Sequence, residues 1–301
     1  MKRKIVAVVG STGLVGKTFL KISTTLPFEI VCFGRNQMSM DDLFVVQPDY
    51  CVFLTPENVS KQYIPKLAKL GCCCIDNSSA FRMQNFPLVV PEINGHVLKK
   101  SDKIIANPNC TTIQIAYVLN ALKDLEIKRV FASTYQAVSG GGKNALEDLY
   151  RGREEGATVG VPHKIANNFF AEIGNFLPNG NTTEEEKVVC ECKKILNMPK
   201  LTVDCMAVRV PVSHCHGVTL AIDFAKDFSM DNAKELLASC PTIILDNCPM
   251  PIVAVDTPYV FVGRLKKNKK RLTCFVVADN LWRGASYNAL EILKLMEKLN
   301  G

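Results

Sequence analysis

The chain has 301 residues, of which 48% are hydrophobic and 22% are charged, and its formal net charge is +7. This length is enough for two domains with buried cores, and the composition excludes disordered, collagen-like and coiled-coil chains. The positive excess is too diffuse to predict nucleic-acid binding, and no apolar run approaches the roughly 20 residues of a membrane-spanning helix, so we expect a cytoplasmic protein that contacts no membrane.

The N-terminal part of the chain alternates short apolar runs with amphipathic stretches. This is the βαβ pattern of a parallel sheet covered by helices. Strands are predicted at residues 5–9, 29–33, 50–54, 72–75 and 104–106. Helices are predicted at residues 15–22, 58–70 and 111–122.

The rest of the chain is richer in β-forming residues, which predicts a mixed or antiparallel sheet in a second domain. Its apolar runs cover residues 129–135, 201–212, 218–224, 260–265 and 272–278. The basic run at residues 266–271 is predicted to be an exposed loop tip, with a polyanion-binding patch as the alternative. An amphipathic helix at residues 285–299 is expected to pack back on the first domain.

A glycine-rich segment follows the first predicted strand and opens the first predicted helix. It reads Gly10-Ser11-Thr12-Gly13-Leu14-Val15-Gly16. Glycines here let the backbone approach a pyrophosphate, whose charge is met by the N–H groups at the helix start. The spacing is G-x-x-G-x-x-G rather than G-x-G-x-x-G, so a tight turn without a ligand is the alternative.

The second predicted strand is followed by Arg35, where an NAD-binding protein has an acidic residue for the ribose. An arginine at this position favours a cofactor with a 2′-phosphate, so the cofactor predicted is NADP(H). A surface cation without a ligand is the alternative for Arg35.

Cys110 lies at the predicted start of a helix, where the macrodipole and free N–H groups stabilise a thiolate. The chain has 13 cysteines, and most lie in apolar runs, where we expect them to pack as free hydrophobic side chains. Their spacing does not indicate a zinc site, so no metal is predicted. A nucleophilic thiol with a nicotinamide cofactor implies acyl chemistry, with hydride passing between the sulfur-bound carbon and the cofactor.

Such a thiol needs a histidine partner, and His214 and His216 both follow the apolar run that ends near Val212. Arg209 lies on the same run, and its guanidinium suits bidentate binding of a carboxylate. For either histidine, an ordinary surface position is the alternative.

Taken together, these segments resemble the aspartate-semialdehyde dehydrogenase family over nearly the whole chain. The resemblance implies a Rossmann-like NADP-binding domain at residues 1–109 and 282–301, and an α+β mixed-sheet catalytic and dimerisation domain at residues 110–281. The matching segments, in the family's order, are residues 10–16, 75–83, 89–94, 107–110, 133–140, 209–212 with His216 after them, and 277–281.

The resemblance also implies roles for individual residues. The catalytic residues would be the nucleophile Cys110, the acid/base His216 and Gln136, which orients the thioester. The substrate would be held by Arg82, Asn109, Glu184, Lys187 and Arg209, where three consecutive glutamates leave the register of the Glu184 and Lys187 pair open. The cofactor would contact Gly10, Ser11, Thr12, Gly13, Leu14, Val15, Arg35, Ser139, Gly140 and Asn280. His214 falls out of register and is expected at the surface.

The implied reaction is the NADPH-dependent reductive dephosphorylation of L-aspartyl-4-phosphate to L-aspartate 4-semialdehyde and phosphate. It belongs to the biosynthesis of lysine, threonine and methionine. The implied assembly is a homodimer, with a tetramer as the alternative.

Two other functions are weighed against this one. N-acetyl-γ-glutamyl-phosphate reductase shares the architecture and the thiol chemistry but takes an acylated amine, so a carboxylate at Glu184 argues for a free ammonium substrate. A non-catalytic dinucleotide-binding relative would be expected to lack Cys110, His216 or Arg209, and all three are present.

Overall fold

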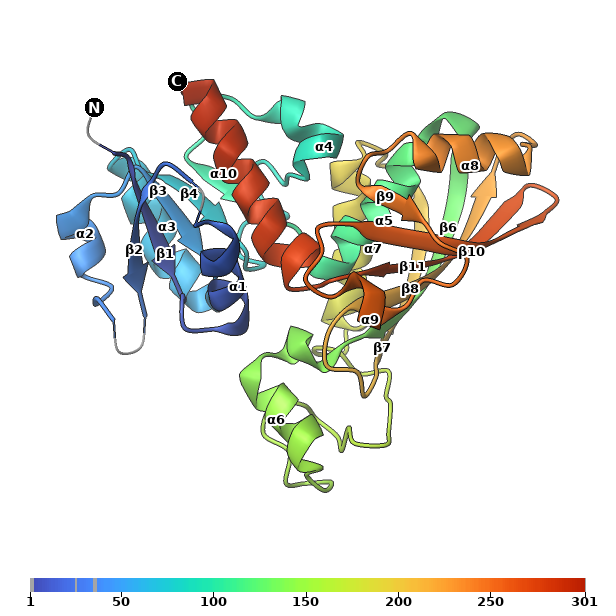
Figure 1. The fold of residues 1–301 in the computed structure, drawn as a ribbon, viewed down its shortest axis with the longest axis horizontal. Helices are drawn as coiled ribbons and strands as arrows, with labels where there is room; N and C mark the ends of the chain where they lie inside the picture. Colours follow the sequence, from blue (N-terminus) through green and yellow to red (C-terminus); the bar gives the residue numbers. More distant parts are fainter. Residues whose placement is uncertain (1–2, 25, 35–36, 301) are drawn as a thin grey trace. The chain divides into compact units, whose positions relative to one another are not determined.

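The structure, a computed structural model, describes residues 3–24, 26–34 and 37–300. Contacts between Cα atoms divide the chain into a first unit, residues 1–109 and 285–301, and a second unit, residues 110–284 (Figure 1). Each unit contains one sheet with helices. The predicted α/β class, with a parallel sheet and a mixed sheet, is confirmed.

The first unit is built on a five-stranded parallel sheet in the order β2-β1-β3-β4-β5. Every residue of β3 and β4 is buried, as expected for a parallel sheet with both faces covered. The order of the strands reverses between β1 and β3, where sheets of this type bind ligands outside the carboxyl ends of the strands. The strands are β1 (Ile5–Val9), β2 (Glu29–Phe33), β3 (Tyr50–Phe53), β4 (Cys73–Asp76) and β5 (Ile104–Ala106).

The C-terminal helix belongs to this first unit. Figure 1 shows α10, in red, beside the blue strand and helix that begin the chain. Leu293 and Met296 of α10 share a buried core with Phe19 of α1 and Val8 of β1. The helices of the unit are α1 (Leu14–Ile22), α2 (Asp42–Val46), α3 (Glu57–Lys69), α4 (Pro91–Asn94) and α10 (Tyr287–Asn300).

The second unit is built on a six-stranded mixed sheet in the order β7-β6-β8-β11-β10-β9. The β6/β7 and β9/β10 pairs are parallel, and the other pairs are antiparallel. The strands are β6 (Ile127–Gln136), β7 (Thr202–Arg209), β8 (His216–Phe224), β9 (Ile243–Leu245), β10 (Val260–Asn268) and β11 (Arg271–Ala278).

Helix α5 lies at the centre of the second unit. Residues 111–119 of this helix are all buried, and α5 contacts β6, β8 and β11 as well as α7 and α8. A helix that is apolar on all sides is a core helix, so its first residue is held in a fixed position. The helices of the unit are α5 (Cys110–Ala121), α6 (Lys143–Arg151), α7 (Thr183–Ile195), α8 (Met230–Ala238) and α9 (Pro251–Ala254).

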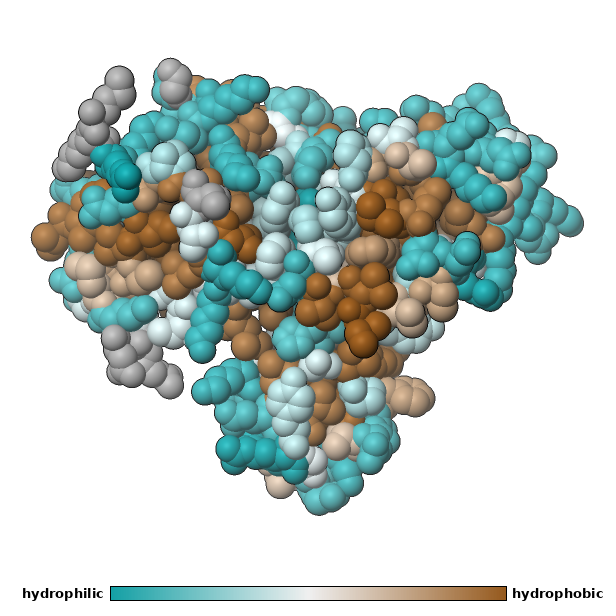
Figure 2. All heavy atoms as spheres, viewed as in Figure 1, coloured by the Kyte–Doolittle hydropathy of each residue, from teal (hydrophilic) through white to brown (hydrophobic). Residues whose placement is uncertain are grey.

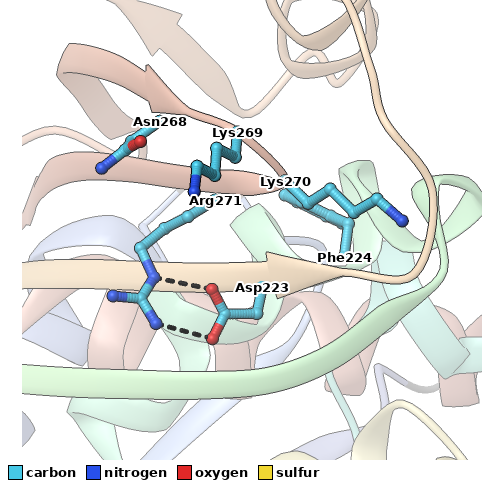
Figure 3. Close-up of a pocket in the computed structure, with 6 residues that line it drawn as sticks. All are labelled: Asp223, Phe224, Asn268, Lys269, Lys270 and Arg271. Atoms are coloured by element: carbon cyan, nitrogen blue, oxygen red, sulfur yellow. Dashed lines mark hydrogen bonds and ion pairs between the residues drawn. The ribbon is translucent and has the colours of Figure 1, made fainter.

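The basic run at residues 266–271 forms the end of the β10–β11 hairpin, which is hydrophilic in Figure 2. Figure 3 shows the surface pocket beside it, where Arg271 donates two hydrogen bonds to the carboxylate of Asp223, at 2.6 and 2.8 Å. Lys267 is paired with Asp227 in the same hairpin region. These ion pairs therefore involve two of the five positively charged side chains of the run.

Candidate active site

Cys110 and His216 lie in hydrogen-bonding contact. Cys110 is the first residue of α5, and His216 is the first residue of β8. The distance between Cys110 Sγ and His216 Nε2 is 3.2 Å. The thiol therefore combines a helix N-terminus, which favours the thiolate form, with an imidazole as its hydrogen-bonding partner.

His216 is buried, with 1% of its surface exposed, and its second ring nitrogen is also occupied. Nδ1 accepts a hydrogen bond of 3.0 Å from the main-chain N–H of Ala137. Burial and the positive charge of Arg209 lower the pKa of His216 to about 3, while the Glu184 carboxylate and a hydrogen bond with the backbone of Cys215 oppose this shift. The imidazole is therefore neutral at physiological pH.

Arg209 ends β7 directly beside the end of β6, where it pairs with Gln136 in the parallel register. Its guanidinium is buried and donates a hydrogen bond of 2.6 Å to the carbonyl of Ala137. A Cβ atom on Gly140 would lie 3.1 Å from Arg209 Nη1 and 3.4 Å from His216 Cε1, so a glycine keeps this space open. Burial lowers the pKa of Arg209, and the charges of Glu184 and Cys110 oppose that shift.

The buried side chains of Gln136 and Glu184 are joined to this group of residues by hydrogen bonds. Gln136 Nε2 donates to Thr111 Oγ1 at 2.7 Å and to Glu184 Oε1 at 3.3 Å. The other carboxylate oxygen of Glu184 accepts from Lys187 Nζ at 3.1 Å. Hydrogen bonds therefore run from Thr111, directly after the thiol, to the lysine.

The register of the acidic run in α7 follows from the different partners of its glutamates. The carboxylate of Glu185 accepts hydrogen bonds from the N–H groups of Thr182 and Ala207. Glu186 accepts from Asn181 and contacts Cys190. Glu184, by contrast, contacts Gln136 and Lys187.

Ser139 and Asn280 lie together in the same unit. Asn280 Nδ2 donates to Ser139 Oγ at 3.0 Å, and Asn280 Oδ1 accepts the N–H of Cys215 at 2.9 Å. Cys215 has a positive φ of 69°, which is uncommon for a non-glycine residue. Asn280 thus holds the backbone in this conformation directly before His216.

The predicted dinucleotide loop connects β1 to α1 in the first unit. Gly10 has a φ of +84°, and a Cβ atom there would lie 2.4 Å from the carbonyl oxygen of Leu54, so only glycine fits. Gly13 is the N-cap of α1 and provides no side-chain cap for the helix, and the first turn, which is fully described, contains no acidic residue. These features fit the pyrophosphate of a dinucleotide, because N–H groups are left to meet its charge. Arg35 lies outside the described residues.

Arg82 and Asn109 also belong to the first unit, and both are buried. Arg82 Nη2 donates a hydrogen bond of 2.7 Å to the carbonyl of Asn77. The preceding residue, Asp76, is fully buried and accepts hydrogen bonds from the hydroxyls of Ser60 and Ser78, both at 2.7 Å. These bonds fix the turn after β4 that carries Arg82.

Six predicted site residues of the second unit therefore form one connected group: Cys110, His216, Arg209, Gln136, Glu184 and Lys187. Thr111 and the N–H of Ala137 belong to the same group but were not predicted. Thr111 could have been predicted from its position directly after the nucleophile. The contact of Ala137 is made by the main chain, so its residue type gives no signal.

The described parts of the chain contain no metal-binding cluster, no disulfide and no membrane-spanning helix. Within residues 3–24, 26–34 and 37–300, no group of three or more His, Cys, Asp or Glu side chains is placed to hold a metal ion. None of the 13 cysteines, all of which lie in these ranges, forms a disulfide, and the sulfurs of Cys72 and Cys74 lie 4.0 Å apart. Over the same ranges, no helix has the length and apolar character needed to span a bilayer.

Comparison with known proteins gives consistent matches. Residues 35–101 match the family model of the semialdehyde dehydrogenase NAD binding domain, and residues 119–283 match that of the semialdehyde dehydrogenase dimerisation domain. The chain is 39% identical to the aspartate-semialdehyde dehydrogenase of Aquifex aeolicus, over 97% of this chain and 98% of that protein. It is 36% identical to the enzyme of the same name from Bacillus subtilis, over 98% of both chains.

A solved structure gives a matching fold. It is the aspartate semialdehyde dehydrogenase II of Vibrio cholerae, complexed with ASA. The TM-score is 0.93 at 30% sequence identity, and the match covers 99% of both chains.

Proposed function

The chain belongs to the aspartate-semialdehyde dehydrogenase family, and we propose that it catalyses the NADPH-dependent reductive dephosphorylation of L-aspartyl-4-phosphate to L-aspartate 4-semialdehyde. The observation that carries this proposal is the contact of 3.2 Å between Cys110 Sγ and His216 Nε2 at the start of a buried helix. The product would serve the biosynthesis of lysine, threonine and methionine. We place the reaction in the cytoplasm, where free cysteines stay reduced.

Cys110 is the proposed nucleophile. Its thiolate attacks the acyl carbon of the substrate, phosphate leaves, and a thioester forms on the sulfur. Gln136 orients this thioester, and His216 acts as the acid/base group at the reacting atoms. NADPH, when bound, supplies the hydride that reduces the thioester to the aldehyde.

Substrate recognition is proposed to depend on charge. Arg209 is buried and its planar guanidinium suits the α-carboxylate, while Glu184 is a buried carboxylate that suits the free ammonium. Lys187 in the second unit, and Arg82 and Asn109 in the first unit, are assigned to the phosphate. An acetylated amine carries no charge to pair with Glu184, so the geometry favours aspartyl phosphate over N-acetyl-γ-glutamyl phosphate.

The proposed cofactor is NADP(H). Its pyrophosphate would lie against the loop from Gly10 to Val15, where Gly10 allows close approach of the backbone. Ser139, Gly140 and Asn280 are the cofactor residues that we propose in the second unit. In this proposal residues 1–109 and 282–301 form the NADP-binding domain, and residues 110–281 form the catalytic and dimerisation domain.

We propose a homodimer, from which a tetramer could also be built, as the assembly. One face of the mixed sheet exposes large apolar side chains: Phe131 is 46%, Tyr135 39% and Met206 48% exposed. Exposed apolar side chains that cluster on a sheet face are typical of a protein–protein interface. This face lies within the segment that matches a dimerisation domain.

The test of this function is the reverse reaction, followed as phosphate-dependent reduction of NADP by aspartate semialdehyde. Wild type and Cys110→Ala are compared, with NAD and N-acetylglutamate semialdehyde as the alternative cofactor and substrate. We expect activity with aspartate semialdehyde and NADP that is lost in Cys110→Ala. Turnover of N-acetylglutamate semialdehyde instead would assign the rival reductase, and no turnover of either aldehyde would favour a non-catalytic relative.

A further inference from the structure

His163 lies in the loop between α6 and α7, where both nitrogens of its ring face carboxylates. Nδ1 lies 3.0 Å from Glu155 Oε1, and Nε2 lies 2.8 Å from Glu172 Oε2. An ionised carboxylate can only accept hydrogen bonds, so each ring nitrogen must carry a proton to donate to its neighbour. A neutral ring has one proton and would turn a lone pair toward one of the two carboxylates. The contacts therefore fit an imidazolium.

The pKa of the ring agrees with its contacts. Hydrogen bonds to Glu155 and Glu172 raise the pKa of His163 above its ordinary value of 6.5, while desolvation opposes this shift. The neighbouring Lys164 is paired with Glu154 at 2.7 Å, and its N–H donates to Glu155 at 2.6 Å. The positive charge on His163 is therefore present below pH 6.5 and is lost as pH rises through the raised pKa.

The imidazolium joins the two ends of residues 155–172, a segment that we call the strap. The start of the strap is held to α6, because the N–H groups of residues 159–161 donate to the carboxylate of Asp148. The ring of Phe170, near the end of the strap, packs against His163 in a T-shaped arrangement with 5.1 Å between the centroids. His163 therefore connects the end of the strap to its anchored start.

The strap reaches the proposed active site through the main chain of Phe170. The N–H of Phe170 donates to the carbonyl of Arg209 at 3.1 Å, and the N–H of Arg209 donates to the carbonyl of Phe170 at 2.8 Å. Strand β7 is an edge strand of the mixed sheet, and at Arg209 the strap takes the place of a further antiparallel strand. Phe170 therefore holds the backbone from which the Arg209 guanidinium extends.

We propose that His163 is a positioning residue, whose imidazolium keeps the end of the strap on Arg209 and so sets the affinity of the site for the substrate carboxylate. This inference deepens the proposed function and rests on it for the identity of the substrate. When the ring loses a proton, one of the two carboxylates faces a lone pair, and the end of the strap is released from its start. The dependence on pH thus arises outside the group of residues around Cys110.

The expected effect is on substrate binding rather than on the chemical step. The α-carboxylate that we assign to Arg209 does not change in the reaction, so a displaced guanidinium weakens the binding of substrate and transition state alike. KM should therefore rise while kcat is kept. The His163 side chain is 40% exposed, and ion pairs at such positions are individually weak, so we expect a change of several-fold rather than a loss of activity.

The protonation of His163 is measured by NMR of the histidine ring protons of the full chain between about pH 5 and 9. The chain has 4 histidines, and the signal of His163 is identified by its loss in His163→Asn. We expect a midpoint above 6.5 that falls in Glu172→Gln, because a neutral amide no longer favours the charged ring. Glu154→Gln is the matched control, since Glu154 pairs with Lys164 rather than with the ring. A midpoint at or below 6.5, or an equal fall in both variants, would overturn the inference.

The link to Arg209 is measured by hydrogen exchange of the Phe170 and Arg209 amides, which form the bridge between the strap and β7. Exchange rates are corrected for the intrinsic effect of pH and compared among wild type, His163→Asn and Glu172→Gln. We expect the protection of both amides to fall with the midpoint of the NMR titration, and to be reduced at every pH in His163→Asn. Protection that does not follow the titration would contradict the positioning role.

Steady-state kinetics test the consequence for the reaction. We expect KM for aspartate semialdehyde to rise about threefold to tenfold as pH increases through the midpoint, the equivalent of one hydrogen bond. In Glu172→Gln this rise should move to lower pH, with kcat within about twofold of wild type. Titrations of phosphate, of the substrate and of Cys110 are common to all variants, so a shift between variants belongs to His163. A rise at the same pH in wild type and Glu172→Gln would contradict the inference.

The NMR and exchange measurements do not depend on turnover. Amides that follow the titration of His163 in a protein without activity toward aspartate semialdehyde would count against the proposed function alone. An active protein whose Phe170 and Arg209 amides do not respond to the titration would count against this inference alone.

Discussion

Glu184 differs from its two neighbours in α7 because its carboxylate faces the group of residues around Cys110. It accepts from Gln136 and Lys187, whereas Glu186 accepts from Asn181 near the start of the helix. Glu184 is 7% exposed, so little water screens the charge of its carboxylate. Removing this charge should therefore have a large effect on its interactions.

We expect Glu184→Gln to lower kcat/KM for aspartate semialdehyde by about 10- to 100-fold, the usual cost of a hydrogen bond to a charged group. The lost charge would leave the substrate ammonium without its partner. Glu186→Gln is the matched control and should keep kcat/KM within about twofold, as is usual for a surface change. Steady-state kinetics of both variants measure this, and equal losses in the two would refute the assignment of Glu184.

The residue types of this group were mostly predictable from the sequence, but the contacts that join them were not. Cys110 stood out by its polar surroundings, Arg209 by its place on an apolar run, and His216 by its place after that run. Glu184 could not be told from Glu185 and Glu186, because the choice depends on long-range contacts. The N–H of Ala137 gave no signal at all, because every residue except proline carries one.

At the scale of elements, the start of α5 is packed tightly against Gly284. A Cβ atom on Gly284 would lie 2.8 Å from Cys110 Cβ and 3.2 Å from Cys110 Cα. A methyl group there would have to displace the nucleophile or the chain that follows β11. The backbone of Gly284 is not in the left-handed region, so the effect of a substitution is steric.

We expect Gly284→Ala to lower kcat by about tenfold or more, because small displacements of a reacting atom are costly. Overpacking should also lower the free energy of unfolding by about 1–3 kcal/mol. Activity and urea unfolding are measured on the same preparation. An alanine variant with wild-type kcat would show that Cys110 is not held by this contact.

Helix α6 is tied to the loop that follows it by one buried carboxylate. Asp148, whose side chain is 0% exposed, accepts from the N–H groups of Val159, Gly160 and Val161 and pairs with Arg153. Burial alone would raise the pKa of Asp148, but these N–H groups and Arg153 hold it below its ordinary value of 3.8. The carboxylate therefore stabilises the fold above that pH.

We expect Asp148→Asn to lower the free energy of unfolding by about 2–3 kcal/mol at neutral pH, because asparagine keeps only one acceptor oxygen and has no charge to pair with the buried N–H groups and Arg153. The difference from wild type should persist at neutral pH and shrink as pH falls through the lowered pKa of Asp148, below 3.8, because protonation removes the same charge from the wild type. Glu147→Gln is the control. It removes a charge near the same arginine, because Glu147 lies 3.7 Å from Arg153, but the Glu147 side chain is 36% exposed rather than buried. Urea unfolding between neutral and acidic pH decides this, and a difference that grows on acidification would contradict the account.

The strands were more predictable than the shorter helices. Buried runs such as β1, β3 and β11 are almost uniformly apolar, so composition alone indicates them. Helices α6 and α8 have nine residues each and were not predicted. Helix α8 has a side-chain cap from Ser229 and contacts α5 and β9, whereas α6 has no side-chain cap and is tied through Asp148 to the N–H groups of residues 159–161. A short window of sequence does not contain such contacts.

At the scale of the whole molecule, the exposed face of the mixed sheet makes the proposed dimer testable. We expect Phe131→Glu to shift the protein from dimer to monomer at micromolar concentration, because a charge would be buried in an apolar interface. Ile252→Glu is the matched control, because Ile252 is an apolar side chain of α9 that is 82% exposed and does not belong to the sheet. Sedimentation velocity measures the assembly, and a wild-type monomer, or a dimer in both variants, would contradict this interface.

The central claim is that Cys110 carries the acyl group, and mass spectrometry of the trapped intermediate tests it most directly. The protein is mixed with aspartate semialdehyde and NADP without phosphate, quenched with acid and digested. We expect one aspartyl group on the peptide that contains Cys110, its release when phosphate is added before the quench, and no acyl group in Cys110→Ala. An acyl group on another cysteine, or full turnover without acylation of Cys110, would contradict the account.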